Sequence, residues 1–296
     1  MKASSTRART AMAILAVVIG VFVISVAPLI VQTSLERVLT ALIEVAKERP
    51  AFSSGISLFS LFYPLWRALA FIAGVTLLVI APQIYKGEEW TYPVALVAYA
   101  IPAIGGMFMF LPYISWVGGF PLPMVLSWVA LIGFWGTIFL RDGDLTQKLA
   151  DFFTLTFIGM LATHSFTLGI GSQRMLLTRP GKPLFEGLDW WILTWVGEVD
   201  WIATVLLLVA IPLLAMRKSS GWWLALITSL SVLLIDAPTQ LIRTKTLDYL
   251  YGSLLSAGTL FFLLLPIFKE RLTGDSRSRL AHSEPTEVQQ SIATTG

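Results

Sequence analysis

The chain has 296 residues, of which 56% are hydrophobic and only 13% are charged, and its mean hydropathy is +0.76. Soluble domains carry about 25% charged residues, so half that share among long apolar runs excludes an ordinary soluble protein. A net charge of +3 gives no basic patch for nucleic acid, and the lack of cysteine excludes disulfides, iron–sulfur ligation and thiolate chemistry.

The first apolar run, 11–32, resembles a secretory signal peptide, because basic residues precede it and 25–27 looks like a cleavage site. The apolar stretch nevertheless continues to Val31, beyond the roughly 7–15 residues of a signal-peptide core. We therefore expect a retained first helix, preceded by a short cytoplasmic segment, 1–10.

Runs of about 20 apolar residues are typical of helices that cross a bilayer. Eight such runs follow one another along the chain, at 11–32, 56–82, 92–115, 123–140, 149–170, 190–216, 221–243 and 246–268. The sequence therefore predicts an all-α fold, a polytopic integral membrane helical bundle of about eight transmembrane helices that occupies 11–268. The polar tail, 269–296, should be disordered and cytoplasmic.

Two outer loops are predicted to be long, 33–55 and 171–189. In the first loop, Leu35, Val38 and Leu42 recur at helical spacing with charged residues opposite them, which predicts an amphipathic helix. This helix should lie on the outer surface or, as we favour, cap the bundle. The second loop combines proline, glycine and basic residues, so an irregular segment with a positive face is expected.

The order of helices and loops suggests an internal duplication. In each half, one helix, one long outer loop and three further helices follow one another, and the runs 56–82 and 190–216 have equal length. Four helices per unit would make a 4+4 pseudo-repeat parallel and not inverted. Residue identity between the halves is faint, so the pattern of lengths carries this expectation.

The distribution of lysine and arginine predicts the orientation in the membrane. With both ends inside, the inner segments hold 12 of these residues and the outer segments hold 8. Cytoplasmic loops carry the excess of basic residues in membrane proteins. We therefore expect a multi-pass protein of the cell membrane with both termini in the cytoplasm. Its partners would be the lipid bilayer and other membrane subunits or a second copy of the chain, with no nucleic acid.

Ionisable side chains inside the predicted spans are the main functional lead, because a charge at the centre of a bilayer costs roughly 3 kcal/mol. Counting residues along each helix places these side chains at a similar depth, in the outer half of the bilayer or near its midplane. Together with one neighbouring glutamine, they are the predicted binding or proton-relay residues: Arg67, His164, Glu198, Asp200, Asp236 and Gln240.

Asp236 is the first candidate among them. Pro238 follows closely, and a proline removes one helical hydrogen bond and frees the carbonyl of the residue four positions earlier, here Leu234. A carboxylate beside a freed carbonyl could bind a proton or a cation. The alternative is a plain helix kink in which Asp236 bonds to Thr239 or Gln240.

Charge counting sharpens this expectation. Glu198 and Asp200 point about 200° apart on one helix, so only one of them can pair with Arg67. If Arg67 and Arg243 each neutralise one acid, one carboxyl remains, and it must be protonated, reach water or bind a cation. A neutral, hydrogen-bonded carboxyl is the alternative.

His164 is expected to be a hydrogen-bonded residue of the bundle. A metal site formed with Glu198 and Asp236 is a weaker alternative, so we predict no metal, no other cofactor and no catalytic residues. Asp151, which lies in the first turn of the predicted fifth helix, is assigned to capping amides and favouring the helix dipole there.

Three functions fit this pattern. We favour a carrier, that is, a small-solute or proton-binding membrane protein with an outward-facing polar site in the bundle. The alternative is a non-catalytic structural subunit of a membrane complex, in which the buried charges fix helix positions. Less favoured is an intramembrane lipid-modifying enzyme, for which Glu198 and Asp236 would be the acid–base pair.

Overall fold

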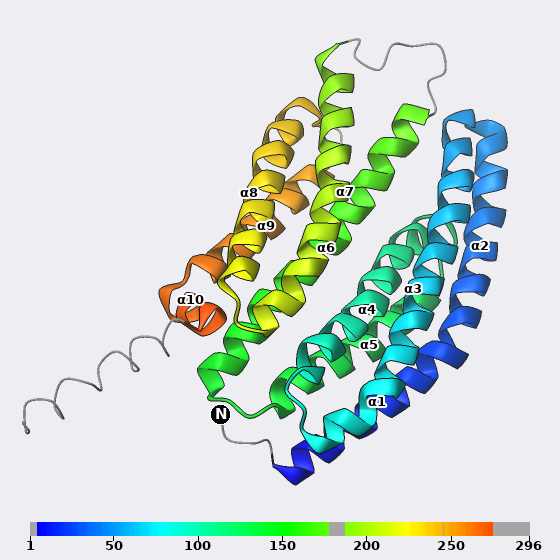
Figure 1. Cartoon of the computed structure of the whole chain (residues 1–296). Coiled ribbons are helices and arrows are strands. Elements are labelled where there is room, and N and C mark those ends of the chain that lie inside the picture. The colour runs from blue at the N-terminus through cyan, green and yellow to red at the C-terminus, as the bar shows by residue number, and fades with distance from the viewer. Residues whose placement is uncertain (1–4, 178–186, 245, 275–296) are drawn as a thin grey trace, which may run out of the picture.

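The computed structural model describes residues 5–177, 187–244 and 246–274, and these residues form helices and connecting turns without a strand (Figure 1). The α-helices are α1 (Thr6–Ser25), α2 (Ala27–Glu48), α3 (Ser53–Lys86), α4 (Thr91–Trp116), α5 (Leu122–Leu140), α6 (Leu145–Leu177), α7 (Leu188–Ala215), α8 (Ser219–Ile242), α9 (Asp248–Leu264) and α10 (Pro266–Thr273). The predicted all-α helical bundle is thereby confirmed.

Seven helices in the described residues are long and apolar enough to cross a membrane. The eighth predicted span, 246–268, is broken: α9 and α10 meet at an angle of 76°. Leu265 lies between them with ψ of 118°, the extended conformation that a residue before proline prefers. Counting this bent pair as one span gives the eight spans expected.

The amphipathic helix predicted in 33–55 is present, but it does not cap the bundle. α2 restarts directly after α1, separated only by Val26, and runs alongside α3 (Figure 1). Pro28 lies in the first turn of α2, where a missing N–H costs nothing, so this proline begins a helix and ends none. The apolar stripe of α2, with Val38 and Leu42 buried, packs along the bundle.

The helices form two rings of four. In the N-terminal unit, α1–α2 packs on α3, α3 on α4, α4 on α5, and α5 returns to α1. The C-terminal unit repeats this order: α6 packs on α7, α7 on α8, α8 on α9, and α9 returns to α6. This shared cyclic order is what a 4+4 repeat predicts.

An aromatic cluster fills the contact between the two units. Phe62 and Trp66 of α3 and Phe108 of α4 meet Phe166 of α6 and Trp201 of α7. The rings contact edge to face with centroids 4.9–5.4 Å apart, an arrangement that adds attraction beyond burial of area. The cluster therefore joins the units, while the interior of each ring holds its own side chains.

The bundle has two ends, which we name by the chain. The proximal end is where α1 begins, and it carries the α5–α6 and α7–α8 turns and α10 (Figure 1). The distal end carries the α2–α3 and α8–α9 turns.

Parts of the predicted loop 171–189 and tail 269–296 are helical. Gly171–Leu177 completes α6, and Lys269–Thr273 belongs to α10. The remaining residues of interest, 178–186 and 275–296, lie outside the described residues.

Candidate functional site

The interior of the C-terminal unit holds two carboxylic acids, Asp200 of α7 and Asp236 of α8, each with 0% exposure. They are close enough to interact through their charges. Small residues on the Asp200 face of α7, Gly197 and Ala203 among them, let the neighbouring helices approach and enclose it. We call Asp200 and Asp236 the acid pair.

Gly252 of α9 closes the site on the side of Asp236. A Cβ atom at this position would lie 1.9 Å from Asp236 Oδ2, so the carboxyl group would have to move, and 3.3 Å from His164 Cδ2. The glycine therefore lets α8, α9 and α6 converge, and it places Asp236 and His164 on the same small volume.

Neither acid has a hydrogen-bond partner or takes part in an ion pair among the described residues. The Ser165 hydroxyl lies beside Asp200, but outside hydrogen-bond geometry. Thr239 donates to the carbonyl of Ile235 at 2.6 Å, so it does not satisfy Asp236. The alternative in which Asp236 bonds to Thr239 or Gln240 is therefore wrong.

Gln240 fixes the turn between α8 and α9 and does not touch the acids. Its Nε2 donates to the carbonyl of Thr246 at 2.7 Å, and its Oε1 accepts from the N–H of Leu250 at 2.8 Å. This side chain holds the start of α9 over the distal end of α8, which fixes the height of Gly252 against Asp236.

His164 is a hydrogen-bonded residue of the bundle, as expected. Its Nε2 lies 2.8 Å from the backbone carbonyl of Asp248, at the start of α9. Because a carbonyl accepts, this nitrogen carries the proton and Nδ1 is the free acceptor of the neutral ring. His164 thus ties α6 to α9 at the level of the acid pair.

Glu198 and Arg67 do not belong to this site. Glu198 lies two residues from Asp200 and is exposed on the outer face of α7. Arg67 donates to Gln32 Oε1 at 2.7 Å, and Gln32 donates to Glu36 Oε1 at 2.8 Å, on the exposed side of α2 and α3. The expected pairing of Arg67 with a membrane acid is therefore wrong.

The cross-helix carboxyl pair is consequently Asp200 with Asp236, whereas the sequence favoured Glu198 with Asp236. The metal site weighed for His164, Glu198 and Asp236 fails for the same reason, because Glu198 points away from the other two side chains. No group of three or more His, Asp or Glu side chains in the described part of the chain could hold a metal ion.

A pocket of about 430 Å³ opens at the distal end of the C-terminal unit. Its lining includes Arg174 of α6, Asp189 of α7 and Arg243 after α8. Tyr249 of α9, which is 2% exposed, interacts electrostatically with Arg243 and with both acids. The tyrosine is thus within the range of charge interaction both of Arg243 in this distal pocket and of the acid pair.

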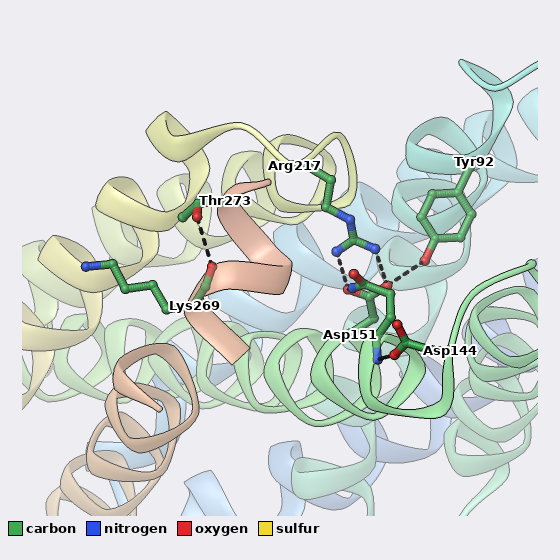
Figure 2. A network of polar contacts seen from close by, with 7 residues as sticks. Tyr92, Asp144, Asp151, Arg217, Lys269 and Thr273 are labelled. Atoms are coloured by element: carbon green, nitrogen blue, oxygen red, sulfur yellow. Dashed lines mark hydrogen bonds and ion pairs between the residues drawn. The ribbon is translucent and has the colours of Figure 1, made fainter. Parts of the chain in front are cut away.

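A second polar cluster lies at the proximal end, and the sequence did not predict it (Figure 2). Arg217, in the turn after α7, donates two hydrogen bonds to Asp151 of α6, at 2.5 and 2.6 Å. Gln147 adds a third at 3.1 Å, and the Tyr92 hydroxyl lies 3.5 Å from Asp151 Oδ2. α6 begins at Leu145, so Asp151 is a buried residue of the second turn and no cap of the first.

Charge and backbone both support the Arg217–Asp151 pair. Burial alone would lower the pKa of Arg217, but the hydrogen bond and charge of Asp151 outweigh it and raise that pKa. Arg217 also adopts φ of 61°, the left-handed conformation that glycine usually supplies at a helix C-terminus. The N–H groups of Arg217 and Lys218 close the end of α7 on Leu214 and Leu213.

A pocket of about 430 Å³ surrounds this proximal cluster. Arg141 stacks its guanidinium 3.8 Å over the ring of Tyr92. Asp144, on the rim, pairs with Arg271 of α10 at 2.8 Å, so the bent C-terminal helix helps to close the proximal end. Asp151 therefore lies at the floor of a polar, solvent-facing pocket.

An apolar pocket of about 260 Å³ lies between α4, α5 and α6. Its lining includes Trp128, Trp135 and Met160, and no acid among the described residues contributes to it. An intramembrane enzyme would need two acids facing such a pocket, and the acid pair lies in a different part of the molecule.

No protein-family model matches the chain, and neither a curated protein nor a solved structure is significantly similar to it.

Proposed function

We propose that this multi-pass membrane protein is a proton-coupled carrier in which the acid pair binds the coupling proton inside the C-terminal unit. The observation that carries the proposal is the placement of Asp200 and Asp236 together, fully buried and without a hydrogen-bond partner in the described residues. Two adjacent carboxylates in an apolar interior repel each other and lose their hydration. At least one proton on the pair removes most of that penalty.

The surroundings of the pair support reversible proton binding. His164 holds its Nε2 proton on a backbone carbonyl, and neither acid forms an ion pair with an arginine in the described residues. A fixed cation in contact would hold both carboxylates ionised permanently, and a carboxyl in that state could not exchange protons.

The distal pocket supports a site for the transported solute. Arg174 and Arg243 offer planar donors that suit a carboxylate, and Asp189 lies opposite as an acceptor. We propose a small carboxylate-bearing solute, which enters from the outer side if the proximal end faces the cytoplasm. Tyr249 would connect solute binding to the protonation of the acid pair.

The proposal is tested by reconstituting the full chain into vesicles on a solid-supported membrane and applying a pH jump. Proton binding to the pair should give a transient current in the wild type. Asp236→Asn and Asp200→Asn should each lose at least most of that current, because an amide does not titrate. Glu198→Gln is the matched control, since Glu198 faces outward, and it should keep the current.

A wild type without any transient current, or a current that survives in both aspartate variants, contradicts the proposal. A panel of amino acids and short carboxylates applied in the same chamber then identifies the solute. Arg243→Gln should weaken the response to the solute while leaving the pH-jump current of the acid pair in place.

The second candidate, a structural subunit of a membrane complex, is favoured by the exposed polar groups. Arg67, Gln32 and Glu36 form a hydrogen-bonded row on the outer side of α2 and α3, and Glu198 is exposed on α7. A partner helix could cover such groups. Native mass spectrometry of the chain purified from its own membranes tests this candidate function. A stoichiometric second polypeptide that is lost in Arg67→Leu would support the role of a subunit. Detection of the chain without a second polypeptide would support the carrier.

A further inference from the structure

Buried serine and threonine hydroxyls in the C-terminal unit differ from those elsewhere in the bundle. Six of them are at most 2% exposed and have no hydrogen-bond partner among the described residues. They are Thr154, Ser165 and Ser172 of α6, Thr228 and Ser229 of α8, and Ser256 of α9.

Buried serine and threonine hydroxyls of the N-terminal unit are bonded in the usual way, although the Tyr99 hydroxyl of α4, also buried, has no partner among the described residues. Ser34, Thr91 and Ser127 each donate to a backbone carbonyl at 2.6–2.9 Å. Hydroxyls on the outer side of the C-terminal unit do the same, such as Thr163 and Ser231. Because more than about 90% of buried polar groups are bonded in proteins, six exceptions inside one ring of helices require a common cause.

The six hydroxyls are spread over the length of the bundle. Helix rise places Ser172 about 10 Å distal to Ser165 and Asp200, and Ser256 about 6 Å proximal to Gly252. Ser229 lies about 10 Å proximal to Asp236. Thr154 lies about 16 Å proximal to Ser165. The hydroxyls of Ser229 on α8 and Ser256 on α9 thus lie at levels between Thr154 and Ser165, where α6 itself offers apolar residues.

The two ends of this series meet the two polar pockets. Ser172 packs against Gly197 of α7 and interacts with Tyr249, beside the distal pocket. Thr154 lies one turn from Asp151 on the same face of α6, and Asp151 lines the proximal pocket. From Ser172 to Asp151 the series covers about 31 Å, which equals the thickness of a hydrocarbon core of about 30 Å.

We propose that a chain of water molecules runs through the C-terminal unit from the distal pocket to Asp151, and that it carries protons between the acid pair and the proximal end. Buried water typically makes two to four hydrogen bonds to polar groups that would otherwise lack partners, which is what these hydroxyls and carboxylates offer. A proton accepted at one end of such a chain releases another at the opposite end, so no further reactant is needed. Proton transfer by this route rests on the proposed function; the presence of water does not.

The titratable groups along the path come from all four helices. The acid pair is contributed by α7 and α8, His164 by α6 and Tyr249 by α9. Asp151 and Arg217 stand at the proximal end, bonded to each other. Their pairing fixes the Asp151 carboxylate at the proximal end, and the water of the path opens there into the pocket.

Radiolytic hydroxyl-radical labelling of the full chain in lipid tests for the water directly, because radicals formed in bound water oxidise the side chains around it. Leu161 is the reporter, since it lies on α6 between Thr154 and Ser165 with 0% exposure. Leu77 and Leu96 of the N-terminal unit also have 0% exposure and are the matched controls. We expect labelling of Leu161 several-fold above both controls, and equal labelling of all three leucines would overturn the path.

The pH-jump current then tests proton transfer. The double variant Ser229→Ala/Ser256→Ala removes two of the six hydroxyls and should slow the decay of the current several-fold. Ser231→Ala is the control, because the Ser231 hydroxyl donates to the carbonyl of Ile227 on the outer face, and it should leave the decay unchanged. An unchanged decay in the double variant overturns the path. A pH-jump current without labelling of Leu161 would refute the water path but keep proton binding by the acid pair. Labelling of Leu161 without any current would keep the water but refute proton binding by the acid pair. If the double variant does not fold, the labelling contrast among the three leucines still decides.

Discussion

Arg217 shows at the scale of one residue how the proximal end is stabilised. A non-glycine residue in the left-handed conformation costs roughly 1–2 kcal/mol. The bidentate contact with Asp151, which is 3% exposed, explains why an arginine is found there. Removing one partner of a buried ion pair costs about 3–5 kcal/mol, because the other charge stays behind uncompensated.

A comparison of Arg217→Ala with Arg217→Gly separates the two effects. Both lose the ion pair, but only glycine relieves the backbone. We expect the stability order wild type, Arg217→Gly, Arg217→Ala, with the two variants about 1 kcal/mol apart. Thermal unfolding in detergent measures this order, and equal stability of the two variants would show that the backbone of Arg217 is unstrained.

Asp200 also shows what could be read from the sequence at this scale. Helix geometry alone points Glu198 and Asp200 in nearly opposite directions. The residues around each of them indicate which acid is buried. The Asp200 face carries Gly197, Ala203 and Thr204, which are small and buried, whereas large side chains such as Ile202 and Val205 are exposed to the membrane. Small residues mark helix contacts in bilayers, so the buried acid was predictable from them.

Close contact between elements depends on Gly252, where α9 meets Asp236 of α8 and His164 of α6. A Cβ atom there would require the carboxyl group to move, since the two would otherwise be 1.9 Å apart. At Gly159 of α6, by contrast, no atom lies within 4 Å of the position that a Cβ would take. The two glycines therefore form a matched pair for substitution.

Gly252→Ala should abolish or strongly reduce the pH-jump current and lower the melting temperature, because α9 or Asp236 must shift. Gly159→Ala should keep the current and, since alanine favours helix by about 1 kcal/mol over glycine, hold or raise stability. Normal proton binding in Gly252→Ala would mean that Asp236 is not enclosed by α9.

The elements themselves were largely predictable, and the exceptions have physical reasons. The length of an apolar run indicates a membrane span independently of how that helix packs, so the sequence predicts the seven long apolar helices. Pro28 was compatible with a helix end or a helix start, and only packing of α2 on α3 selects the start. The polar turn before 149 hid the true beginning of α6 at Leu145, which is why Asp151 was mistaken for a cap.

At the scale of the whole molecule, the even number of crossings puts the α1 start and α10 at the proximal end (Figure 1). The balance of basic residues predicts that this end faces the cytoplasm. Because the chain contains no cysteine, single cysteines can be introduced without a background. Ser53 and Thr244 are exposed at the distal end, and Ser219 is exposed at the proximal end.

A membrane-impermeant maleimide applied to intact cells should label Ser53→Cys and Thr244→Cys. Ser219→Cys should react only after the cells are permeabilised. The reverse pattern would invert the orientation and, with it, the side from which the distal pocket is reached. Labelling of all three positions from one side would contradict the arrangement of the spans.

Helix and loop lengths suggest a 4+4 pseudo-repeat, and the shared packing order of the two units agrees with it, but the lengths do not predict that the interiors of the units differ. Both rings pack their helices in the same order, yet the acid pair and the six serine and threonine hydroxyls without partners in the described residues belong to the second ring. Length and hydropathy describe where helices run; the choice between a bonded and an unbonded hydroxyl depends on side-chain directions that only the assembled bundle defines.

The central claim, that Asp200 and Asp236 together hold a proton inside the membrane, is tested most directly by infrared spectroscopy of the protein in lipid vesicles at neutral pH. The account predicts a carbonyl band of a protonated carboxyl in the wild type and in Glu198→Gln. That band should be weakened or shifted in each single Asp→Asn variant and lost in Asp200→Asn/Asp236→Asn. A wild-type spectrum that is identical to that of the double variant in this region would contradict it.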